Sequence, residues 1–284
     1  AHDPDVNTVL TFLIVAGNEE EWFTIDRKSG RVTTASVLDY EERQSYDLLI
    51  QASDGQNTAV APLTVKVVDI NDKQPVFTHS HYNFSVFEEL QENVSVGTVL
   101  AVDGDTGKNA EVHYSIIGNK ASAAFHIDKD GNILTRRSLD REMETKIEFL
   151  VIAFDRGVPQ LSGTATVLVR VDDINDNPPQ FDRESYTVLV PEEKEPPFKV
   201  FEMNAADKDE GENALIKYNI VQGNDHQAFE IDEETGIVYT ADKLNYEDQP
   251  QYILRVAASN RRAFQGPKAS IIANTVVDLV VKVQ

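Results

Sequence analysis

The residues best suited to chemistry in this chain are carboxylates and amides that recur at a fixed interval. The string Asp69-Ile70-Asn71-Asp72 returns letter for letter as Asp173-Ile174-Asn175-Asp176, at a spacing of about 100 residues, which is a normal domain length. Each string follows an alternating apolar run and precedes a proline. Carboxylate and amide oxygens are the hard ligands that calcium prefers. The repeated string therefore indicates a module with a cation site at each joint.

Further acids recur in phase with this string. They comprise three Asp-x-Asp pairs and a late Asp in two of the units: Asp3/Asp5, Asp103/Asp105, Asp207/Asp209, Asp54 and Asp155. Neighbouring carboxylates repel by about 1 kcal/mol per pair in water and by several times more near protein, so a cation should compensate them. The chain has no cysteine, which excludes thiolate sites and favours calcium over zinc or copper. Extracellular calcium modules bind at roughly 0.1–1 mM, which predicts a secreted or cell-surface setting.

The rest of the unit repeats as well. Phe-x-Ile-Asp strings begin at Phe23, Phe125 and Phe229, and related Leu-x-x-Glu strings begin at Leu38, Leu139 and Leu244. These series recur in one order and at nearly one period, so we interpret the chain as three copies of a unit of about 100 residues. The acids that end the first series, Asp26, Asp128 and Asp232, are expected to set turns rather than to bind metal.

Each unit has the pattern of a β domain. β-rich and alternating runs occur in all three units: 46–50, 147–151, 252–256, 63–67, 167–171 and 277–283. Turn signals separate these runs, and long amphipathic helix patterns are absent. Many short strands per unit predict an antiparallel β-sandwich. An antibody-like domain is disfavoured because its Cys…Trp…Cys core is absent.

Composition excludes several classes of function. The net charge of −22 disfavours nucleic acid and anionic membrane surfaces as partners. No apolar stretch approaches the roughly 20 residues that span a bilayer, so a membrane anchor is expected outside this fragment. The paired acids recur in every unit rather than once in a cleft, and the six histidines are scattered. We therefore expect no enzyme, such as a two-carboxylate glycosidase, and no small-molecule substrate.

These strings resemble the motifs of the cadherin family. The Asp-x-Asn-Asp joint, the Leu-Asp-x-Glu string and the Ala-x-Asp-x-Asp string match in the family's order over essentially the whole chain. The resemblance implies an all-β rod of tandem seven-stranded Greek-key β-sandwiches, with up to three Ca2+ ions at each interdomain joint. It also implies three domains: 1–72 without the family's first strands, 73–176 complete, and 177–284 without a downstream linker string.

The resemblance carries a ligand set onto each joint, with side chains as ligands unless a carbonyl is named. At the first joint the implied ligands are Asp39, Glu41, the Ile70 carbonyl, Asn71, Asp72, the Lys73 carbonyl, Asp103, Asp105, the Asn109 carbonyl and Asp155. At the second joint they are Glu88, Asp140, Glu142, the Ile174 carbonyl, Asn175, Asp176, the Asn177 carbonyl, Asp207, Asp209 and the Asn213 carbonyl.

Three departures from the family pattern bear on these sites. The first joint lacks the glutamate that the family's first strands supply, so we expect fewer or weaker ions there. In the second unit either Glu88 or Glu92 could be that glutamate, and the strand phase from Tyr82 favours Glu88. In the third unit we place Ser259 where a ligand Asp belongs, so the ion nearest repeat three at the second joint should be weakened or absent.

The functional hypothesis is a fragment of a calcium-dependent cell–cell adhesion ectodomain. It would lie outside the cell in a single-pass plasma-membrane protein and bind another cadherin ectodomain, the same or related. The alternative is a set of spacer repeats in a signalling or receptor ectodomain with recognition elsewhere. Asn83 and Asn93 begin N-glycosylation sequons. Trp22, the only tryptophan, is expected to pack in the core rather than to exchange between molecules.

Overall fold

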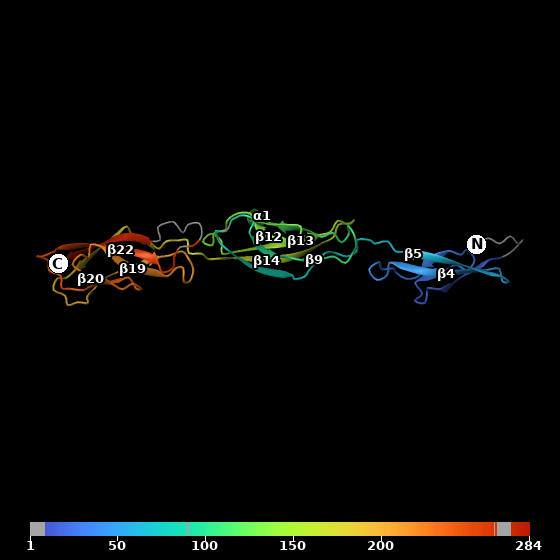
Figure 1. Cartoon of the computed structure of the whole chain (residues 1–284), viewed down its shortest axis with the longest axis horizontal. Coiled ribbons are helices and arrows are strands. Elements are labelled where there is room, and N and C mark those ends of the chain that lie inside the picture. The colour runs from blue at the N-terminus through green and yellow to red at the C-terminus, as the bar shows by residue number, and fades with distance from the viewer. Residues whose placement is uncertain (1–8, 90, 264, 266–273) are drawn as a thin grey trace.

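The computed structural model describes residues 9–89, 91–263, 265 and 274–284. Three β-rich repeats follow one another end to end, and the two termini lie toward opposite ends of the resulting rod (Figure 1). The described residues form a single short helix, α1 (Asn119–Ala124). No described helix has the length and apolar character needed to cross a membrane.

Repeat one contains two small sheets. Its strands are β1 (Thr11–Ala16), β2 (Phe23–Ile25), β3 (Val32–Thr34), β4 (Ser45–Ser53) and β5 (Thr58–Lys66). The sheet order is β1-β4-β5 in one layer and β2-β3 in the other. Within the described residues, β5 is therefore an edge strand.

Repeat two has seven strands in two main sheets, as the resemblance implied. Its elements are β6 (Val76–Phe77), β7 (His81–Phe87), β8 (Ser95–Thr98), β9 (Ala101–Val102), β10 (His113–Ile117), α1, β11 (Phe125–Ile127), β12 (Asn132–Thr135), β13 (Lys146–Phe154) and β14 (Ser162–Asp172). The sheets are β10-β13-β14-β7 and β11-β12-β8, with a small β6-β9 pair beside them. All pairs are antiparallel except β7 with β14, which run parallel.

Repeat three has the same plan. Its strands are β15 (Gln180–Phe181), β16 (Ser185–Val190), β17 (Lys199–Glu202), β18 (Ala205–Ala206), β19 (Ile216–Gln222), β20 (Phe229–Ile231), β21 (Ile237–Thr240), β22 (Gln251–Asn260) and β23 (Asn274–Val283). The sheets are β16-β23-β22-β19 and β17-β21-β20, with a β15-β18 pair. Here β16 runs parallel to β23.

The alternation of the sequence explains which side chains form the cores. In β14, Val167, Val169 and Val171 are buried while the intervening residues are more exposed, because successive side chains on a strand point to opposite faces. Phe149 of β13 pairs with Val167, and the Phe125 ring stacks on Phe149 at 5.5 Å. The predicted all-β sandwich fold is confirmed.

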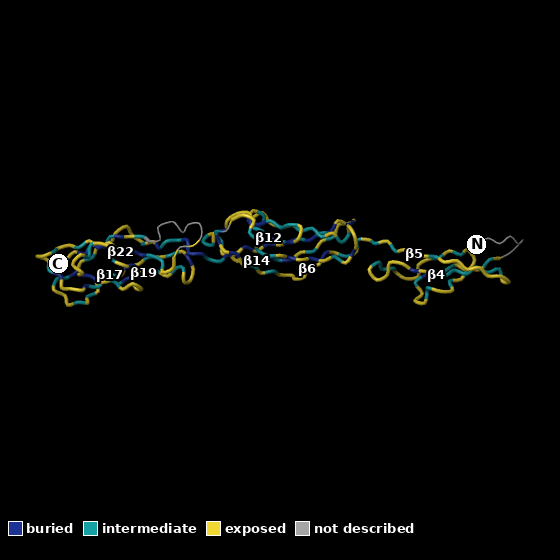
Figure 2. Tube along the Cα trace, in the orientation of Figure 1, coloured by how far each residue is buried: buried dark blue, intermediate teal, exposed yellow. Residues whose placement is uncertain are grey.

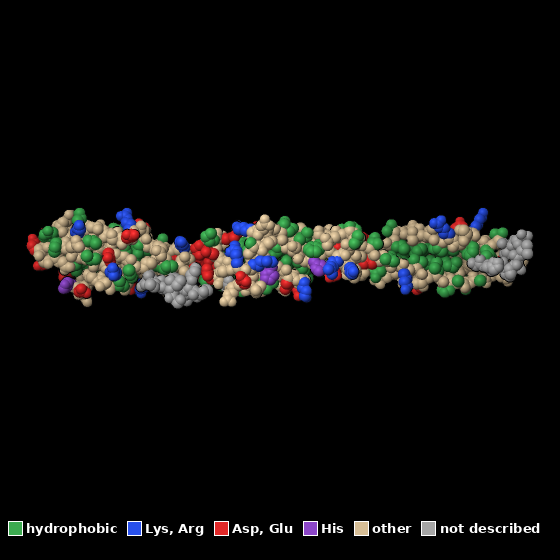
Figure 3. Space-filling model, turned by 90° about the horizontal axis from the view of Figure 1, so that it is seen from above, with side chains coloured by type: hydrophobic (Ala, Val, Ile, Leu, Met, Phe, Trp, Pro, Cys, Tyr) green, Lys and Arg blue, Asp and Glu red, His purple; other side chains and the backbone are tan. Residues whose placement is uncertain are grey.

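Repeat one has a smaller buried core than its neighbours. Only Phe23, Tyr46 and Leu48 are fully buried in its cluster, and its tube is mostly exposed or intermediate (Figure 2). Apolar side chains line one face of this repeat (Figure 3), and Val60 on β5 is 61% exposed. In repeat two, β7 pairs with β14 and covers the edge that corresponds to β5 of repeat one. Among the described residues β5 has no such neighbour, which explains the smaller core of repeat one.

Two smaller sequence predictions are also confirmed. Asp26 accepts backbone hydrogen bonds from Lys28 and Ser29, and Asp128 and Asp232 close the corresponding turns in the same way. Trp22 packs against the core of repeat one, with its ring centroid 5.9 Å from that of Tyr46. Carboxylates that follow a strand often bind the backbone of the next turn, so these acids are structural.

Candidate metal centres

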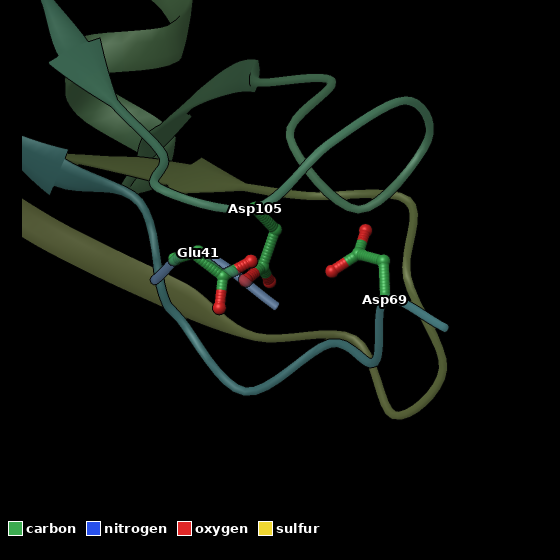
Figure 4. A group of neighbouring side chains, drawn as sticks. All are labelled: Glu41, Asp69 and Asp105. Carbon is green, nitrogen blue, oxygen red and sulfur yellow. The ribbon is translucent and has the colours of Figure 1, made fainter. Parts of the chain in front are cut away.

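The first joint brings carboxylates from two repeats and from the linker to one place. Glu41 precedes β4 of repeat one, Asp69 lies in the linker after β5, and Asp105 follows β9 of repeat two. One oxygen of each lies within 4.8 Å of the others, and the three carboxylates face a common space (Figure 4). The linker therefore folds so that segments far apart in sequence share one acidic cluster.

Asp69 was not among the predicted ligands, although it is the first letter of the repeated string. Its Oδ2 accepts hydrogen bonds from the Thr106 backbone (3.2 Å), the Thr106 hydroxyl (2.8 Å) and the Asn109 amide (3.1 Å). Its Oδ1 is buried without a hydrogen-bond partner. The repetition of this Asp was the available signal, since a purely solvated residue need not recur.

Asn71 links the first linker to repeat two. Its Nδ2 donates to Asp155 Oδ2 at 3.0 Å and to the Pro159 carbonyl at 2.5 Å. Asp155 is fully buried and also accepts from the backbone of Gly157 and Leu161. Asp103 Oδ1 accepts from the Asp105 backbone at 3.0 Å. These contacts place the predicted residues Asn71, Asp103, Asp105 and Asp155 around one joint.

The second joint holds a more deeply buried cluster. Glu88 is 1% exposed, and its two oxygens accept from the backbone of Ile174 (3.0 Å) and of Arg141 (2.8 Å). Oxygens of Glu88, Asp140 and Glu142 lie within 4.8 Å of one another. Glu92 is exposed. The structure thus places Glu88, the favoured candidate, among the acids of the joint.

A second group of acids adjoins this cluster and crosses to repeat three. Oxygens of Glu142, Asp173 and Asp209 also lie within 4.8 Å of one another. Asp173 Oδ2 accepts from the Glu210 backbone (3.0 Å) and the Asn213 amide (2.8 Å). Asp173 was not predicted, and it occupies the place that Asp69 has at the first joint. The first Asp of the repeated string is therefore a member of an acidic cluster at each joint.

The two linkers differ in burial. Ile70 is 68% exposed and Ile174 is 9% exposed. Glu88 draws the Ile174 backbone onto repeat two through a hydrogen bond. Asn175 and Asp176 are also buried, whereas the Asp72 side chain is 47% exposed and lies 3.4 Å from Lys73 Nζ. The second linker is consequently the better packed of the two.

One sequence prediction about repeat three is wrong. Tyr114 pairs with Ala153 in repeat two, and Tyr218 pairs with Ala258 in repeat three. Both tyrosine hydroxyls accept from the equivalent backbone positions, Ala101 and Ala205. The residue equivalent to Asp155 therefore lies two positions after Ala258, at Asn260 and not at Ser259.

Asn260 fills this position with an amide. Its Nδ2 donates to Asp207 Oδ2 at 2.8 Å and to the Asn213 carbonyl at 2.7 Å, and its Oδ1 is buried without a partner. The substitution removes one negative charge while keeping an oxygen in place. The expected weakening of this position thus follows from lost charge rather than from a shortened side chain.

Burial and neighbouring acids raise the pKa of three carboxyl groups at the joints: Glu88, Asp105 and Asp209. Burial raises the pKa of Glu88, with Glu142 and Asp176 adding to the effect. Burial likewise raises the pKa of Asp105, with help from Asp103, Asp69 and Asp72. The pKa of Asp209 rises to about 6, again chiefly through burial. Burial and like charges both disfavour the charged form of an acid, so a bound cation would relieve both costs.

Unsatisfied oxygens mark the same places. Among the described residues, the buried side-chain polar atoms that lack a hydrogen-bond partner are all oxygens at the joints: Asp69 Oδ1, Asn71 Oδ1, Asp103 Oδ2, Asp105 Oδ1, Asn175 Oδ1 and Asn260 Oδ1. A buried oxygen without a partner is costly in a native protein. The donor set consists of hard oxygens without thiolate or imidazole, which fits calcium.

The two sequon asparagines are both exposed. Asn83 is exposed on β7, and Asn93 is exposed after it, with a φ of 63°. Both side chains are therefore accessible, and their glycosylation stays a prediction.

The cadherin domain family model matches residues 1–68, 82–172 and 186–283. This chain belongs to the cadherin family. Among curated cadherin relatives, human Protocadherin Fat 1 is 36% identical over 265 residues, which are 92% of the chain and 6% of that protein. Human Cadherin EGF LAG seven-pass G-type receptor 1 is 37% identical over 284 residues, which are 98% of the chain and 9% of that protein.

The solved structures agree with this cadherin assignment. The crystal structure of mouse Cadherin-23 EC22-24 has a TM-score of 0.83 and 28% sequence identity, and the match covers 99% of this chain and 89% of that one. The chain thus spans only a small part of the curated relatives, yet almost all of a three-repeat cadherin fragment.

Proposed function

We propose that this chain is part of an extracellular cadherin rod whose two joints are stiffened by bound calcium. The observation that carries this proposal is the set of unpartnered buried oxygens within converging acidic groups at both joints. At the first joint Glu41, Asp69, Asp105 and their predicted neighbours would hold the ions. At the second joint Glu88, Glu142, Asp173, Asp209 and theirs would do so.

Stiffening follows from where the oxygens come from. At each joint one acidic cluster draws on the repeat before the joint, on the linker and on the repeat after it: Glu41, Asp69 and Asp105 at the first joint, and Glu142, Asp173 and Asp209 at the second. A short linker by itself restrains two domains weakly. A divalent cation shared among the three segments would oppose bending, and its removal would leave like charges that repel by several kcal/mol per close pair near protein.

Small-angle scattering with and without a chelator tests the proposal. Chelation should broaden the distance distribution and should open residues 69–76 and 173–180 to protease. Asp105→Asn and Asp209→Asn should weaken the calcium response of their own joint, while Asp130→Asn serves as a control because Asp130 lies in an exposed turn. Identical scattering profiles in calcium and in chelator would refute the proposed role of the ion.

The purpose of the rod in the whole protein is the second part of the proposal. We favour adhesion to another cadherin ectodomain, the same or related. Spacer repeats in a receptor are the alternative, because one relative is named as a seven-pass receptor. Sedimentation of this fragment with and without calcium separates them: a calcium-dependent dimer supports adhesion through these repeats, and a monomer under both conditions favours the spacer.

Placement outside the cell belongs to the same proposal, with the membrane anchor beyond this fragment. A single-pass anchor stays a prediction. Expression through a secretory pathway, followed by mass spectrometry of the peptides that contain Asn83 and Asn93, checks the extracellular setting. Glycan on either asparagine supports it, because both are exposed.

A further inference from the structure

Arg141 connects three segments at the second joint. Its side chain is 11% exposed, and its Nε lies 2.5 Å from Asp173 Oδ1 in the linker. Its terminal nitrogen bonds the carboxylate of Glu142 in repeat two and donates to the Lys208 carbonyl of repeat three at 2.6 Å. One guanidinium thus contacts repeat two, the linker and repeat three at once.

The equivalent acids of the two joints show what this guanidinium supplies. Asp69 and Asp173 use their Oδ2 atoms alike, each accepting from the residue after an Asp-x-Asp pair and from an asparagine amide. Their Oδ1 atoms differ: Arg141 donates to that of Asp173, whereas that of Asp69 is buried without a partner. The Leu-Asp-x-Glu string has Tyr40 in repeat one where it has Arg141 in repeat two.

The first joint has a basic residue of its own, but in a different role. Lys73 Nζ lies 3.4 Å from Asp72, the residue before it, and its side chain is 41% exposed. Both partners belong to the linker, so this pair ties no repeat to another. The corresponding residue at the second joint is Asn177.

We infer that Arg141 is a cationic bridge built into the second joint, which holds that joint in order at lower calcium than its acids alone would require. The inference rests on the proposed role of calcium. A buried guanidinium that forms several charge-assisted hydrogen bonds fixes its partners in direction as well as in charge. Arg141 would thereby hold Asp173 and Glu142 ready for an ion while offsetting part of their repulsion.

Spin labels across the second joint measure this directly. The chain has no cysteine, so Lys129→Cys in repeat two and Glu230→Cys in repeat three, both exposed positions, would label cleanly. Distances between the two spin labels would be recorded by double electron–electron resonance while the free calcium concentration is raised from excess chelator to excess calcium. Arg141→Gln should raise the calcium concentration for half-maximal narrowing by roughly fivefold or more, and should give a broader distribution than the parent in chelator. Arg141→Lys, which keeps charge without the planar fork, should fall between them.

Arg137→Gln is the matched control, because Arg137 lies in the same segment and its side chain bonds the neighbouring Ser138 carbonyl, its one hydrogen-bond partner among the residues that the structure describes. Thermal unfolding in saturating calcium would identify any variant in which repeat two is destabilised. If Arg141→Gln is destabilised in this way, the calcium midpoint of Arg141→Lys tests the inference instead. An unchanged or lowered calcium midpoint in Arg141→Gln would overturn the inference. If the distance distribution of the parent protein did not change with calcium, the proposed function would be refuted. The inference about Arg141 would still be tested by comparing the widths of the distance distributions of the parent and of Arg141→Gln in chelator.

The converse change tests the same reasoning at the first joint. Tyr40→Arg offers Asp69 the partner that Asp173 already has. It should lower the calcium concentration for ordering of labels placed across residues 69–76, and an unchanged or higher midpoint would count against the bridge.

Discussion

Asn260→Asp should have opposite effects in chelator and in calcium. Asn260 donates two hydrogen bonds, to Asp207 Oδ2 and to the Asn213 carbonyl. An aspartate at this position would replace both donors by acceptors and would restore the charge that Asp155 has in repeat two. The variant would therefore add repulsion when no ion is bound and add attraction when one is.

The magnitude follows from the distances. Two unit charges 4 Å apart interact by about 4 kcal/mol at an effective dielectric constant of 20. Relaxation and partial protonation reduce this value, so a loss of about 2–4 kcal/mol is expected in chelator. A loss of that size lowers the melting temperature of a 100-residue domain by roughly 10 °C or more. In calcium the added ligand charge should raise the affinity by about tenfold, or about 1.4 kcal/mol.

Calorimetry in chelator and in calcium measures the two melting temperatures, and competition with a chromophoric chelator measures the affinity. Asp155→Asn, the reciprocal change in repeat two, should weaken calcium at the first joint. Ser259→Asp is the matched control, since Ser259 does not hold the ligand position. The reasoning fails if Asn260→Asp binds calcium no more tightly than the parent, or if Ser259→Asp gains as much.

Three further predictions address the second joint and the core. Glu88→Gln should lower calcium affinity there by at least tenfold and Glu92→Gln should not, as titration calorimetry would reveal; equal effects would refute the assignment of Glu88. Because burial raises the folded-state pKa of Asp209 from 3.8 to about 6, stability in chelator should fall as pH rises from 4 to 6, by up to about 3 kcal/mol. Denaturant titrations should show a smaller fall in Asp209→Asn, and an identical pH profile would contradict the shift. Phe125→Ala, at a fully buried side chain, should cost about 3–5 kcal/mol of unfolding free energy in repeat two, and a loss below 1 kcal/mol would show a looser core.

Much of the fold follows from the repeated strings, because each marks the same strand end or turn wherever it recurs. The alternation from Tyr82 onward places Glu88 on the same face as Val86, directly after the end of β7, so the preference for Glu88 over Glu92 was available from strand phase alone.

The remaining features depend on contacts that local patterns do not contain. Assigning Ser259 in place of Asn260 was an error of one residue, which on a strand exchanges one face for the other; the pairing of Tyr218 with Ala258 settles it. Asp69 and Asp173 end apolar runs, and although their repetition marks them, no local pattern indicates that their side chains turn into the joint. The hydrogen bond from Arg141 to the Lys208 carbonyl joins two domains, and no periodic pattern in the sequence indicates such a contact.

The parallel pairing of β7 with β14 determines how repeat two would carry tension. The chain enters this repeat just ahead of β7 and leaves it after β14, and seven residue pairs join these strands from His81–Thr166 to Phe87–Asp172. A pull on the two linkers would load this ladder in shear, so that its hydrogen bonds share the force instead of opening one by one as in a zipper. Repeats two and three thus have the strand arrangement of a load-bearing tether.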